Sequence, residues 1–432
     1  MRSAIGSCAA ALAVLALAPA GAAGATIVTW EGPAVSKSRF VDPTAAAAAS
    51  YNEPPGVPER PNALRVNVYL PDGYHPDGHR RYPVLYLLHG QGDAFDSWAN
   101  PENGNLLEVA EGFPGLIVMP EGDRGFYANW WNGGRRGAPA WERYHLDELI
   151  PVIERRLRIR HGRRWHAIAG LSMGGEGAMF YASQRPGYFG SAASFSGPLS
   201  IQRPTYQSAF EAGTGQDREA LFGDPEAQEF YWEGHNPRAL VENLRGTRLY
   251  VAAGDGVPDP SSPDEVDNQF GQAAEAELGQ QAAEFADAAT KTGAEVTYAP
   301  HQGIHDWPYW RRDLANAIDW GFFGPAPAAD AHHWTFRTVA RRTEAWGIRL
   351  RFQQQPEDVE TFYRAGRSLI ADGTGSVTVR TRAGCVLRAV PLPFTIDLAR
   401  GHPCTWRSGV AGQLAPSSSD ERPGPLHRLG AR

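Results

Sequence analysis

The chain has 432 residues, of which 42% are hydrophobic and 21% are charged, and its formal net charge is −7. This composition is typical of a globular protein, and the length is ample for a large core. The acidic excess argues against a nucleic-acid partner, which would require a basic surface.

The first 25 residues have the features of a secretory signal peptide. Met1–Arg2 supplies a positive start, Ala9–Ala18 is a short apolar run, and Ala23–Ala25 is a small-residue cleavage site. No later apolar run is long enough for a membrane span. We therefore expect an exported, soluble protein without a membrane span, either extracellular or associated with the cell envelope.

Residues 26–60 are predicted to form an extended N-terminal segment, and strand and helix patterns alternate over residues 61–324. Short apolar runs predict strands at 64–70, 83–88, 116–119, 167–169, 192–195, 248–253 and 295–299. Helices are predicted at 142–157, 176–184, 272–291 and 310–323. The alternation predicts an α/β fold with a mostly parallel central sheet flanked by helices.

A second, smaller domain is expected after a linker at residues 325–331. Period-two alternation at 346–352, 377–381 and 385–390 predicts a small β domain over residues 332–410. This domain holds the two cysteines that remain after the signal peptide, Cys385 and Cys404, and an oxidising compartment favours a disulfide between them. Residues 411–432 are expected to form a disordered tail.

The most specific motif is Gly170-Leu171-Ser172-Met173-Gly174, which has the pattern Gly-x-Ser-x-Gly. It follows a predicted buried strand and precedes a predicted helix, which is the context of a sharp turn that presents a serine nucleophile. Both glycines suit that turn because a neighbouring Cβ would clash there. The sequence therefore predicts that Ser172 is a nucleophile at the carboxyl edge of the sheet.

A serine nucleophile needs a base and a carboxylate that orients the base. His305 is the candidate base because it lies between the last predicted strand and the last predicted helix. The acid stays open between Asp255, at the end of a strand, and Glu275 or Glu277 on the following helix. His301 and His305 could both bind zinc, but the sequence shows no third ligand beside them. We therefore expect neither a metal nor a cofactor.

The loop His89-Gly90-Gln91-Gly92 follows a central strand, and its glycines let backbone N–H groups approach a substrate oxygen. With the N–H of Met173 it would form an oxyanion hole. The candidate lining of a substrate cleft consists of His89, Tyr127, Trp130, Trp131 and Trp307, because flat aromatic faces suit alkyl chains and sugar rings.

With these motifs placed, residues 60–323 resemble the esterase D-like branch of the α/β hydrolases, which includes secreted actinobacterial esterases and the antigen-85 mycolyltransferases. The resemblance rests on 87–90 with Trp98, 119–122, 127–131, the Ser172 motif, 235–237, 254–256 and 305–310. It implies the α/β-hydrolase fold. Among the three acids it favours Glu275, ten residues before Phe285 as in the mycolyltransferases, and it points to the N–H of Gln91 as the second oxyanion donor.

Two departures separate this chain from the mycolyltransferases. They have Asp-Gly where this chain has His89-Gly90, and they lack a counterpart of the β domain at 332–410. The resemblance implies a serine esterase or acyltransferase for carboxylic esters, with a small-molecule or lipid ester as substrate. The alternatives are acyl transfer to a sugar in the cell envelope, and a non-catalytic envelope-binding protein.

Overall fold

The computed structural model describes residues 24–31, 35, 37–41, 64–131, 139–260, 268–328, 331–398 and 404–409. Residues 1–23 of the predicted signal peptide, most of the N-terminal segment and the predicted tail at 411–432 lie outside these ranges. In the part of the chain that is described, no helix is both long and apolar enough to cross a membrane.

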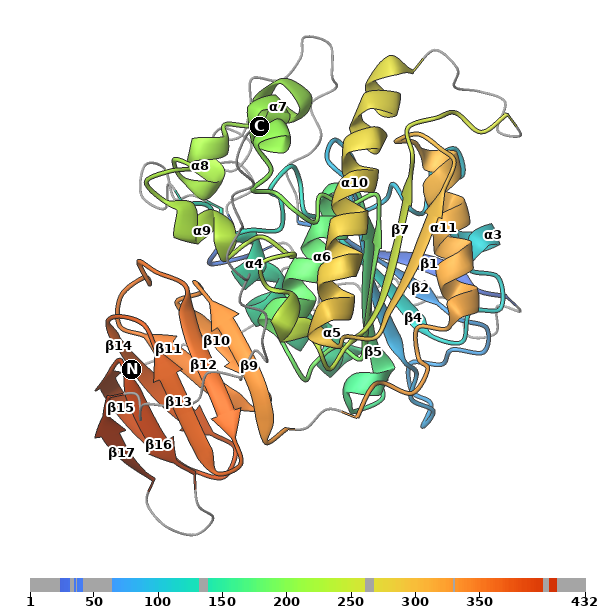
Figure 1. Ribbon diagram of the computed structural model, residues 1–432. Helices are drawn as coiled ribbons and strands as arrows, with labels where there is room; N and C mark the ends of the chain where they lie inside the picture. The colour runs from blue at the N-terminus through green and yellow to red at the C-terminus, as the bar shows by residue number, and fades with distance from the viewer. Residues whose placement is uncertain are drawn as a thin grey trace, which may run out of the picture.

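The larger unit is built on an eight-stranded sheet with the order β1-β2-β4-β3-β5-β6-β7-β8 (Figure 1). Its strands are β1 (Thr26–Trp30), β2 (Val66–Leu70), β3 (Val84–Leu88), β4 (Leu116–Pro120), β5 (His166–Leu171), β6 (Ser191–Phe195), β7 (Arg248–Gly254) and β8 (Val296–His301). All pairs are parallel except β1–β2 and β2–β4. This confirms the predicted α/β-hydrolase fold and adds β1, from the segment predicted to be extended, as an edge strand.

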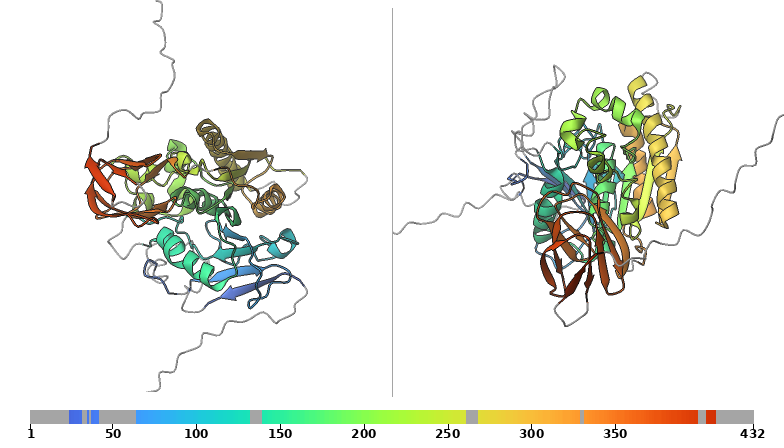
Figure 2. Two further views of the ribbon diagram at one scale, coloured as in Figure 1. Left: turned by 90° about the horizontal axis from the view of Figure 1, so that it is seen from below. Right: turned by 60° about the vertical axis from the view of Figure 1, so that its left-hand side comes forward.

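Helices cover both faces of the sheet (Figure 2). One face carries α3 (Leu106–Val109) and α11 (Trp307–Trp320), and the other carries α5 (Ile150–Arg156), α6 (Met173–Gln184) and α10 (Gln269–Thr292). The predicted helix at 142–157 is divided into α4 (Trp141–Arg143), a π-helical segment (Tyr144–Leu149) and α5.

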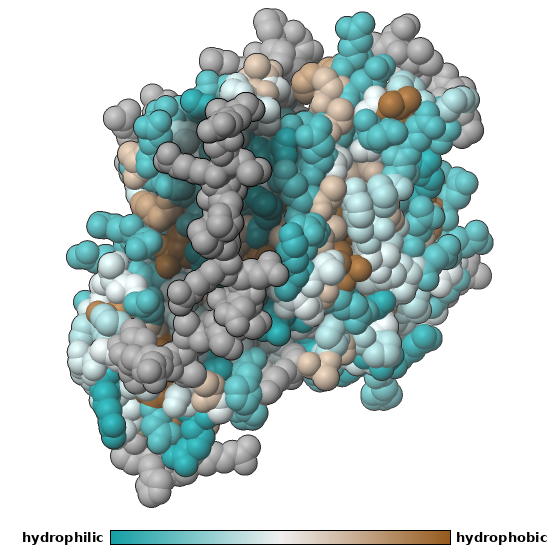
Figure 3. All heavy atoms as spheres, in the orientation of Figure 1, coloured by the Kyte–Doolittle hydropathy of each residue, from teal (hydrophilic) through white to brown (hydrophobic). Residues whose placement is uncertain are grey.

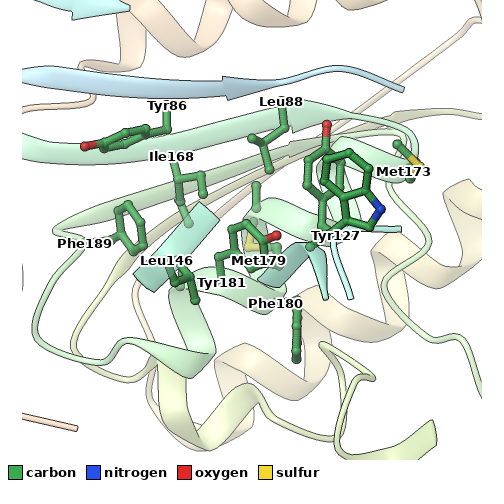
Figure 4. Close-up of a cluster of buried hydrophobic side chains, with 14 of the residues drawn as sticks. Tyr86, Leu88, Tyr127, Leu146, Ile168, Met173, Met179, Phe180, Tyr181 and Phe189 are labelled. Carbon is green, nitrogen blue, oxygen red and sulfur yellow. The ribbon is translucent and has the colours of Figure 1, made fainter. Parts of the chain in front are cut away.

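Alternation along each strand distributes side chains between the two cores. In β3, Tyr86 and Leu88 belong to the core beneath α6, whereas Leu85 and Leu87 belong to the core beneath α11. Figure 4 shows Leu88 and Ile168 directed from the sheet toward the side chains of α6. The fully buried strands explain why the central sheet could be predicted from apolar runs.

On the face of the molecule drawn in Figure 3, hydrophilic residues predominate at the surface.

The connection from β6 to β7 contains helices that the sequence analysis did not predict. They are α7 (Pro204–Thr214), α8 (Arg218–Phe222) and α9 (Glu229–Glu233), followed by a 3₁₀ turn (Val241–Leu244). Phe210 and Phe222 from this insertion are buried against the main core. The insertion therefore packs as part of the larger unit.

The C-terminal unit consists of two antiparallel sheets with a shared apolar core. The first sheet contains β10 (Arg342–Ala345), β11 (Ile348–Phe352), β14 (Ser376–Thr381) and β15 (Val386–Pro391). The second contains β9 (His333–Thr338), β12 (Glu360–Ala365), β13 (Ser368–Asp372), β16 (Phe394–Asp397) and β17 (Thr405–Ser408). The three predicted stretches correspond to β11, β14 and β15, and the other six strands of the sandwich lie in segments without a prediction.

Hydrogen bonds fix the β sandwich against the larger unit. The amide of Trp346 donates to the carbonyl of Pro186 at 2.9 Å, and the hydroxyl of Thr343 donates to the carbonyl of Gln184 at 2.9 Å. Because these hydrogen bonds start from β10 and from the turn after it, the four-stranded sheet has a defined position beside the larger unit.

Cys385 and Cys404 form a disulfide that joins the edges of the two sheets, since the first precedes β15 and the second precedes β17. Replacing Cys404 by serine should lower the free energy of unfolding of the β domain by about 3 kcal/mol, because the loop is no longer closed in the unfolded chain. Urea unfolding monitored by circular dichroism measures this loss. Reduced wild-type protein should lose the same amount, and a Cys404→Ser variant as stable as the oxidised wild type would contradict the expectation.

Candidate active site

Ser172 lies in the turn between β5 and α6, in a backbone conformation that side-chain-bearing residues rarely adopt. Its φ is 50° and its ψ is −123°. The amide of Ser172 donates to the carbonyl of Phe195 at 2.8 Å, which ties the strained turn to β6. The first residue of α6 follows directly, so the positive end of the helix dipole faces the serine.

The two glycines of the motif are required by close backbone contacts. A Cβ on Gly170 would lie 2.3 Å from the carbonyl oxygen of Gly174. A Cβ on Gly174 would lie 2.5 Å from the carbonyl oxygen of His89 and 2.7 Å from that of Leu88. Only glycine lets α6 approach β3 this closely, and that approach holds the serine at the edge of the sheet.

Three of the predicted residues form one chain of hydrogen bonds. His305 Nε2 lies 2.8 Å from Ser172 Oγ, and His305 Nδ1 lies 2.7 Å from Glu275 Oε2. Asp306 caps α11 by accepting from the amide of Trp307 at 2.6 Å, and the amide of His305 donates to the carbonyl of Gly271 at 3.1 Å. The loop before α11 is thereby fixed with its imidazole between the serine and the carboxylate.

Glu275 is fully buried in α10, and both of its oxygens have hydrogen-bond donors. Oε1 accepts from the hydroxyl of Ser196 and from the amide of Gly254, each at 2.6 Å. Burial alone would raise the pKa of Glu275, but the hydrogen bond and charge of His305, with the other two donors, hold this pKa below its ordinary value. The carboxylate is therefore ionised and positioned.

Ser196 connects this carboxylate to the aromatic side of the site. Its Oγ also accepts from Trp310 Nε1 at 3.1 Å, and the ring of Trp310 meets the imidazole of His305 edge-on with centroids 4.8 Å apart. Trp310 thus packs against the imidazole of His305. It also donates a hydrogen bond to Ser196, the residue that donates to the carboxylate of Glu275. No sequence motif singles out Ser196, because its role depends on α10 crossing the end of β6.

The other two candidate acids have different partners. Asp255 is exposed and accepts from the amides of Val257 at 2.9 Å and Gly303 at 3.3 Å. Glu277 Oε1 accepts from Arg203 Nε at 2.7 Å. Glu275 is therefore the one of the three candidates whose carboxylate bonds His305.

His301 lies apart from this arrangement. Its Nε2 is 3.1 Å from Asp313 Oδ2, and its ring stacks on Tyr309. Within the described ranges, no group of three or more histidine, cysteine, aspartate or glutamate side chains is arranged to hold a metal ion.

The candidate oxyanion loop lies against the nucleophile. A Cβ on Gly90 would come within 3.5 Å of the Cβ of Ser172, and both Gln91 and Met173 line the cavity beside Ser172. The side chain of Gln91 donates to the carbonyl of Thr214, which links this loop to the end of α7. Gln91 and Met173 thus both border the cavity at Ser172, and the role of their amides as oxyanion donors stays a prediction.

A cavity of about 470 Å³ opens at Ser172 and His305. It lies between the oxyanion loop, α7 and the first part of α10. Its apolar lining comes from Phe126, Leu171, Tyr206, Ala209, Phe210, Phe270, Ala273, Ala274, Leu278 and Trp310. Sequence analysis missed α7, although Pro204 is a helix-start signal and Tyr206 and Phe210 have helical spacing.

The five residues predicted to line the cleft do not line this cavity, and that prediction needs correction. His89 is buried behind the oxyanion loop, where its Nε2 accepts from the amide of Gly122 at 2.9 Å. The Tyr127 hydroxyl donates to the carbonyl of His89 at 3.0 Å. Trp130, Trp131 and Trp307 pack against other core or insertion residues. Aromatic side chains fill the core here, and the insertion supplies the cavity wall instead.

Burial lowers the pKa of His89, but a hydrogen bond to the carboxylate of Glu121 and the charges of Glu121 and Asp93 outweigh burial and raise that pKa overall. With Tyr127 packed at its carbonyl, His89 supports the loop that carries Gly90 and Gln91. His89 therefore acts on the site by fixing the backbone of the loop, and its side chain does not line the cavity.

Residues 59–320 match the family described as "Putative esterase", and the chain therefore belongs to that family. Esterase Rv1288 of Mycobacterium tuberculosis is 34% identical over 209 residues, which are 46% of this chain and 44% of that protein. The chain thus matches less than half of this relative's length. The MPT51/MPB51 antigen of M. tuberculosis is 29% identical over 245 residues, or 54% of this chain and 74% of that protein.

Similar solved structures include that of M. tuberculosis MPT51, with 25% identity and a TM-score of 0.48 over 64% of this chain and 98% of that chain. A ferulic acid esterase structure has 22% identity and a TM-score of 0.46 over 69% of this chain and 97% of that chain.

The contacts of Glu275 predict a specific effect of the neighbouring serine. Ser196→Ala should lower kcat about tenfold with little change in KM, because a hydrogen bond to a charged group is worth about 1.5–3 kcal/mol. Removing this donor also raises the pKa of Glu275, so the loss of activity on acidification should begin at a higher pH. Steady-state kinetics on a soluble ester across pH measure both effects.

Ser194→Ala is the matched control, since Ser194 is buried in β6, two residues before Ser196, and its Oγ has no hydrogen-bond partner among the described residues. It should keep the wild-type kcat and pH profile. Equal losses in both variants would mean that Ser196 acts only through packing.

Proposed function

We propose that this protein is an exported serine esterase or acyltransferase in which Ser172 attacks a carboxylic ester, His305 transfers the proton and Glu275 orients the imidazole. The observation that carries the proposal is the continuous chain of hydrogen bonds from Ser172 Oγ through His305 to the buried Glu275. Family membership supports ester chemistry, and the strained turn at Ser172 supports the role of nucleophile.

In the proposed reaction, His305 Nε2 takes the proton of Ser172 as Oγ bonds to the ester carbonyl carbon. The carbonyl oxygen becomes an oxyanion held by the amides of Gln91 and Met173, and each such donor is worth roughly 3–4 kcal/mol in the transition state. His305 then protonates the departing alcohol and an acyl-serine remains. Water or a second alcohol, deprotonated by His305, completes the cycle without a metal or cofactor.

Glu275 contributes by staying ionised. Because it accepts three hydrogen bonds in a fully buried position, the imidazole is fixed in the tautomer that leaves Nε2 free to accept the serine proton. The imidazolium that forms after proton transfer then lies beside a negative charge.

The cavity favours a compact apolar acyl or aryl group as the part of the substrate nearest Ser172. Its volume of about 470 Å³ is in the range of small-molecule sites, and its walls are mainly aliphatic and aromatic. The relatives' names cover feruloyl esterase and mycolyltransferase activities, so release of the acyl group to water and transfer to a sugar are both candidate outcomes. We favour hydrolysis, with transfer in the cell envelope as the second candidate.

Export is proposed from the leader-like features of residues 1–25 together with the Cys385–Cys404 disulfide. A disulfide of this kind persists in an oxidising compartment. Association with the cell envelope would follow if the acyl acceptor or donor is an envelope component.

The proposed triad predicts unequal effects of acid replacements. Ser172→Ala and His305→Ala should each lower kcat by several orders of magnitude, because the residues act as a unit. Glu275→Gln should lose most of kcat, whereas Asp255→Asn and Glu277→Gln should keep it, since their carboxylates have other partners. Rates with a p-nitrophenyl ester and labelling of Ser172 by a fluorophosphonate test this.

A Ser172→Ala enzyme with undiminished turnover would overturn the assignment. Failure of the wild type to label or to turn over any ester would favour the alternative of a non-catalytic envelope-binding protein.

Product partition distinguishes hydrolysis from transfer. The experiment is turnover of a p-nitrophenyl ester series with and without trehalose or glucose. The yield of free acid should not change when the sugars are added, because the open cavity admits water to the acyl-serine. Mass spectrometry identifies the products. Acylated sugar formed at the expense of free acid would establish the transferase alternative.

A further inference from the structure

A second concave site lies at the other end of α6 from Ser172, where Arg185 and Tyr188 follow the helix. It is a crevice of about 1110 Å³ between the outer face of the β10–β11–β14–β15 sheet and the segment that contains the π-helical turn and α5. It shares no lining residue with the cavity at Ser172. We call it the arginine crevice.

The charge of the arginine crevice is opposite to that of the whole chain. Among the described residues that line it there are nine arginines and three acidic residues, whereas the formal net charge of the chain is −7. The sheet contributes Arg342, Arg349, Arg351, Arg380, Arg382 and Arg388, all of them exposed. The other three arginines come from the larger unit, where Asp147 and Glu154 accompany them, so the excess of positive charge lies on the sheet wall.

The arginines are concentrated by strand alternation. Ile348, Leu350 and Phe352 of β11 point into the sandwich core, so Arg349 and Arg351 point outward. Neighbouring strands repeat this arrangement, and the register places arginine directly opposite arginine.

Two such pairs occur across the strands. Arg342 of β10 is paired with Arg351 of β11, and Arg349 of β11 is paired with Arg380 of β14. Like charges directly opposite each other destabilise a sheet. Burial and the charges of Arg351 and Arg143 lower the pKa of Arg342, which reflects the same crowding.

The three acidic residues of the crevice pair with only one of these four arginines, Arg349. Glu344 bonds Arg349 at 2.8 Å and Arg382 at 3.3 Å. Asp147 bonds Arg185 at 2.5 Å and lies 3.7 Å from Arg143.

Glu154 accepts from the Tyr188 hydroxyl at 2.8 Å and lies 3.4 Å from His166. Within the described ranges, Arg342, Arg351, Arg380 and Arg388 therefore form no ion pair. A set of unpaired guanidinium groups remains on the sheet wall.

We propose that the arginine crevice binds a linear anionic polysaccharide, whose carboxylate or phosphate groups pair with the guanidinium groups of the sheet wall. Guanidinium forks match both anions in geometry. The guanidinium groups are distributed over four strands, with side chains on one strand about 7 Å apart, so they suit charges repeated along a polymer better than one small anion.

The shape of the site argues against a bilayer, because a bilayer surface is flat whereas this site is a crevice with the larger unit as its second wall. An acidic peptide held by clustered arginines is the competing occupant, and poly-glutamate in the experiment below tests it. The arginines lie on the face of the sheet, so no peptide backbone is recognised there by strand addition. A glycan recognised through its anionic groups fits a face that offers side chains alone.

Binding of labelled polygalacturonate and of a labelled phosphate-bearing polysaccharide, phosphomannan, to the full-length protein tests the proposal, with neutral dextran and poly-glutamate for comparison. Fluorescence anisotropy should show that at least one anionic glycan binds and that added salt weakens the binding. The better of the two identifies carboxylate or phosphate as the natural group. Arg351→Glu/Arg380→Glu should weaken binding by at least about tenfold, because attraction becomes repulsion at the centre of the wall.

Arg367→Glu/Arg407→Glu is the matched control, because it changes the net charge equally on exposed positions of the other sheet. This variant should bind as the wild type does, and circular dichroism with thermal unfolding should show that both variants are folded. The proposal is overturned if neither glycan binds, if dextran or poly-glutamate binds equally well, or if both double variants lose affinity alike. None of these results depends on ester turnover.

Discussion

The buried carboxylate of Glu275 sets the strictest constraint on the catalytic unit. An ionised group without solvent access is tolerated only when its oxygens are fully hydrogen-bonded. Its donors come from three places, namely Ser196 after β6, Gly254 at the end of β7, and His305 in the loop after β8. The ends of three parallel strands and the start of α10 must therefore meet in one register.

The same requirement explains the tight backbone around the serine. Gly170 and Gly174 allow α6 to approach β3, and Gly254 would carry a Cβ only 2.4 Å from the carbonyl oxygen of Gly303. Each glycine stands where two strand-end loops cross at short distance. Substrate binding depends less on this frame, because the cavity is lined by α7 and α10, whose side chains can vary without moving Ser172 or His305.

Much of the catalytic frame could be predicted from the sequence because its signals are local. The buried strands are continuous apolar runs, and Ser172 and His305 follow strands at fixed places in the chain order. Glu275 could not be separated from Glu277 by spacing alone, since the choice depends on which side of α10 faces the sheet, and it was favoured only through the resemblance. That side is visible in the structure, where Glu275 is buried and Glu277 pairs with Arg203.

The substrate side of the site was not predictable in the same way. Trp130, Trp131 and Trp307 were chosen for their chemistry, but an aromatic ring is buried wherever the fold offers enough apolar volume. The cavity at Ser172 is lined instead by α7 of the β6–β7 insertion and by Phe270 of α10, two segments that are far apart in the chain. No local pattern records such a long-range packing event.

The two concave sites differ in the physical basis of recognition. At Ser172 the cavity walls are mainly apolar, which strengthens the few polar contacts close to its hydroxyl. In the arginine crevice the charges are exposed and separated, so affinity there must rise with the number of anionic groups engaged and fall with salt. A glycan held weakly at several arginines could shift along the sheet without full release, because each ion pair is individually worth little. Such binding would keep the cavity near a polymer that carries many esters, while leaving the choice of ester to the apolar walls around Ser172.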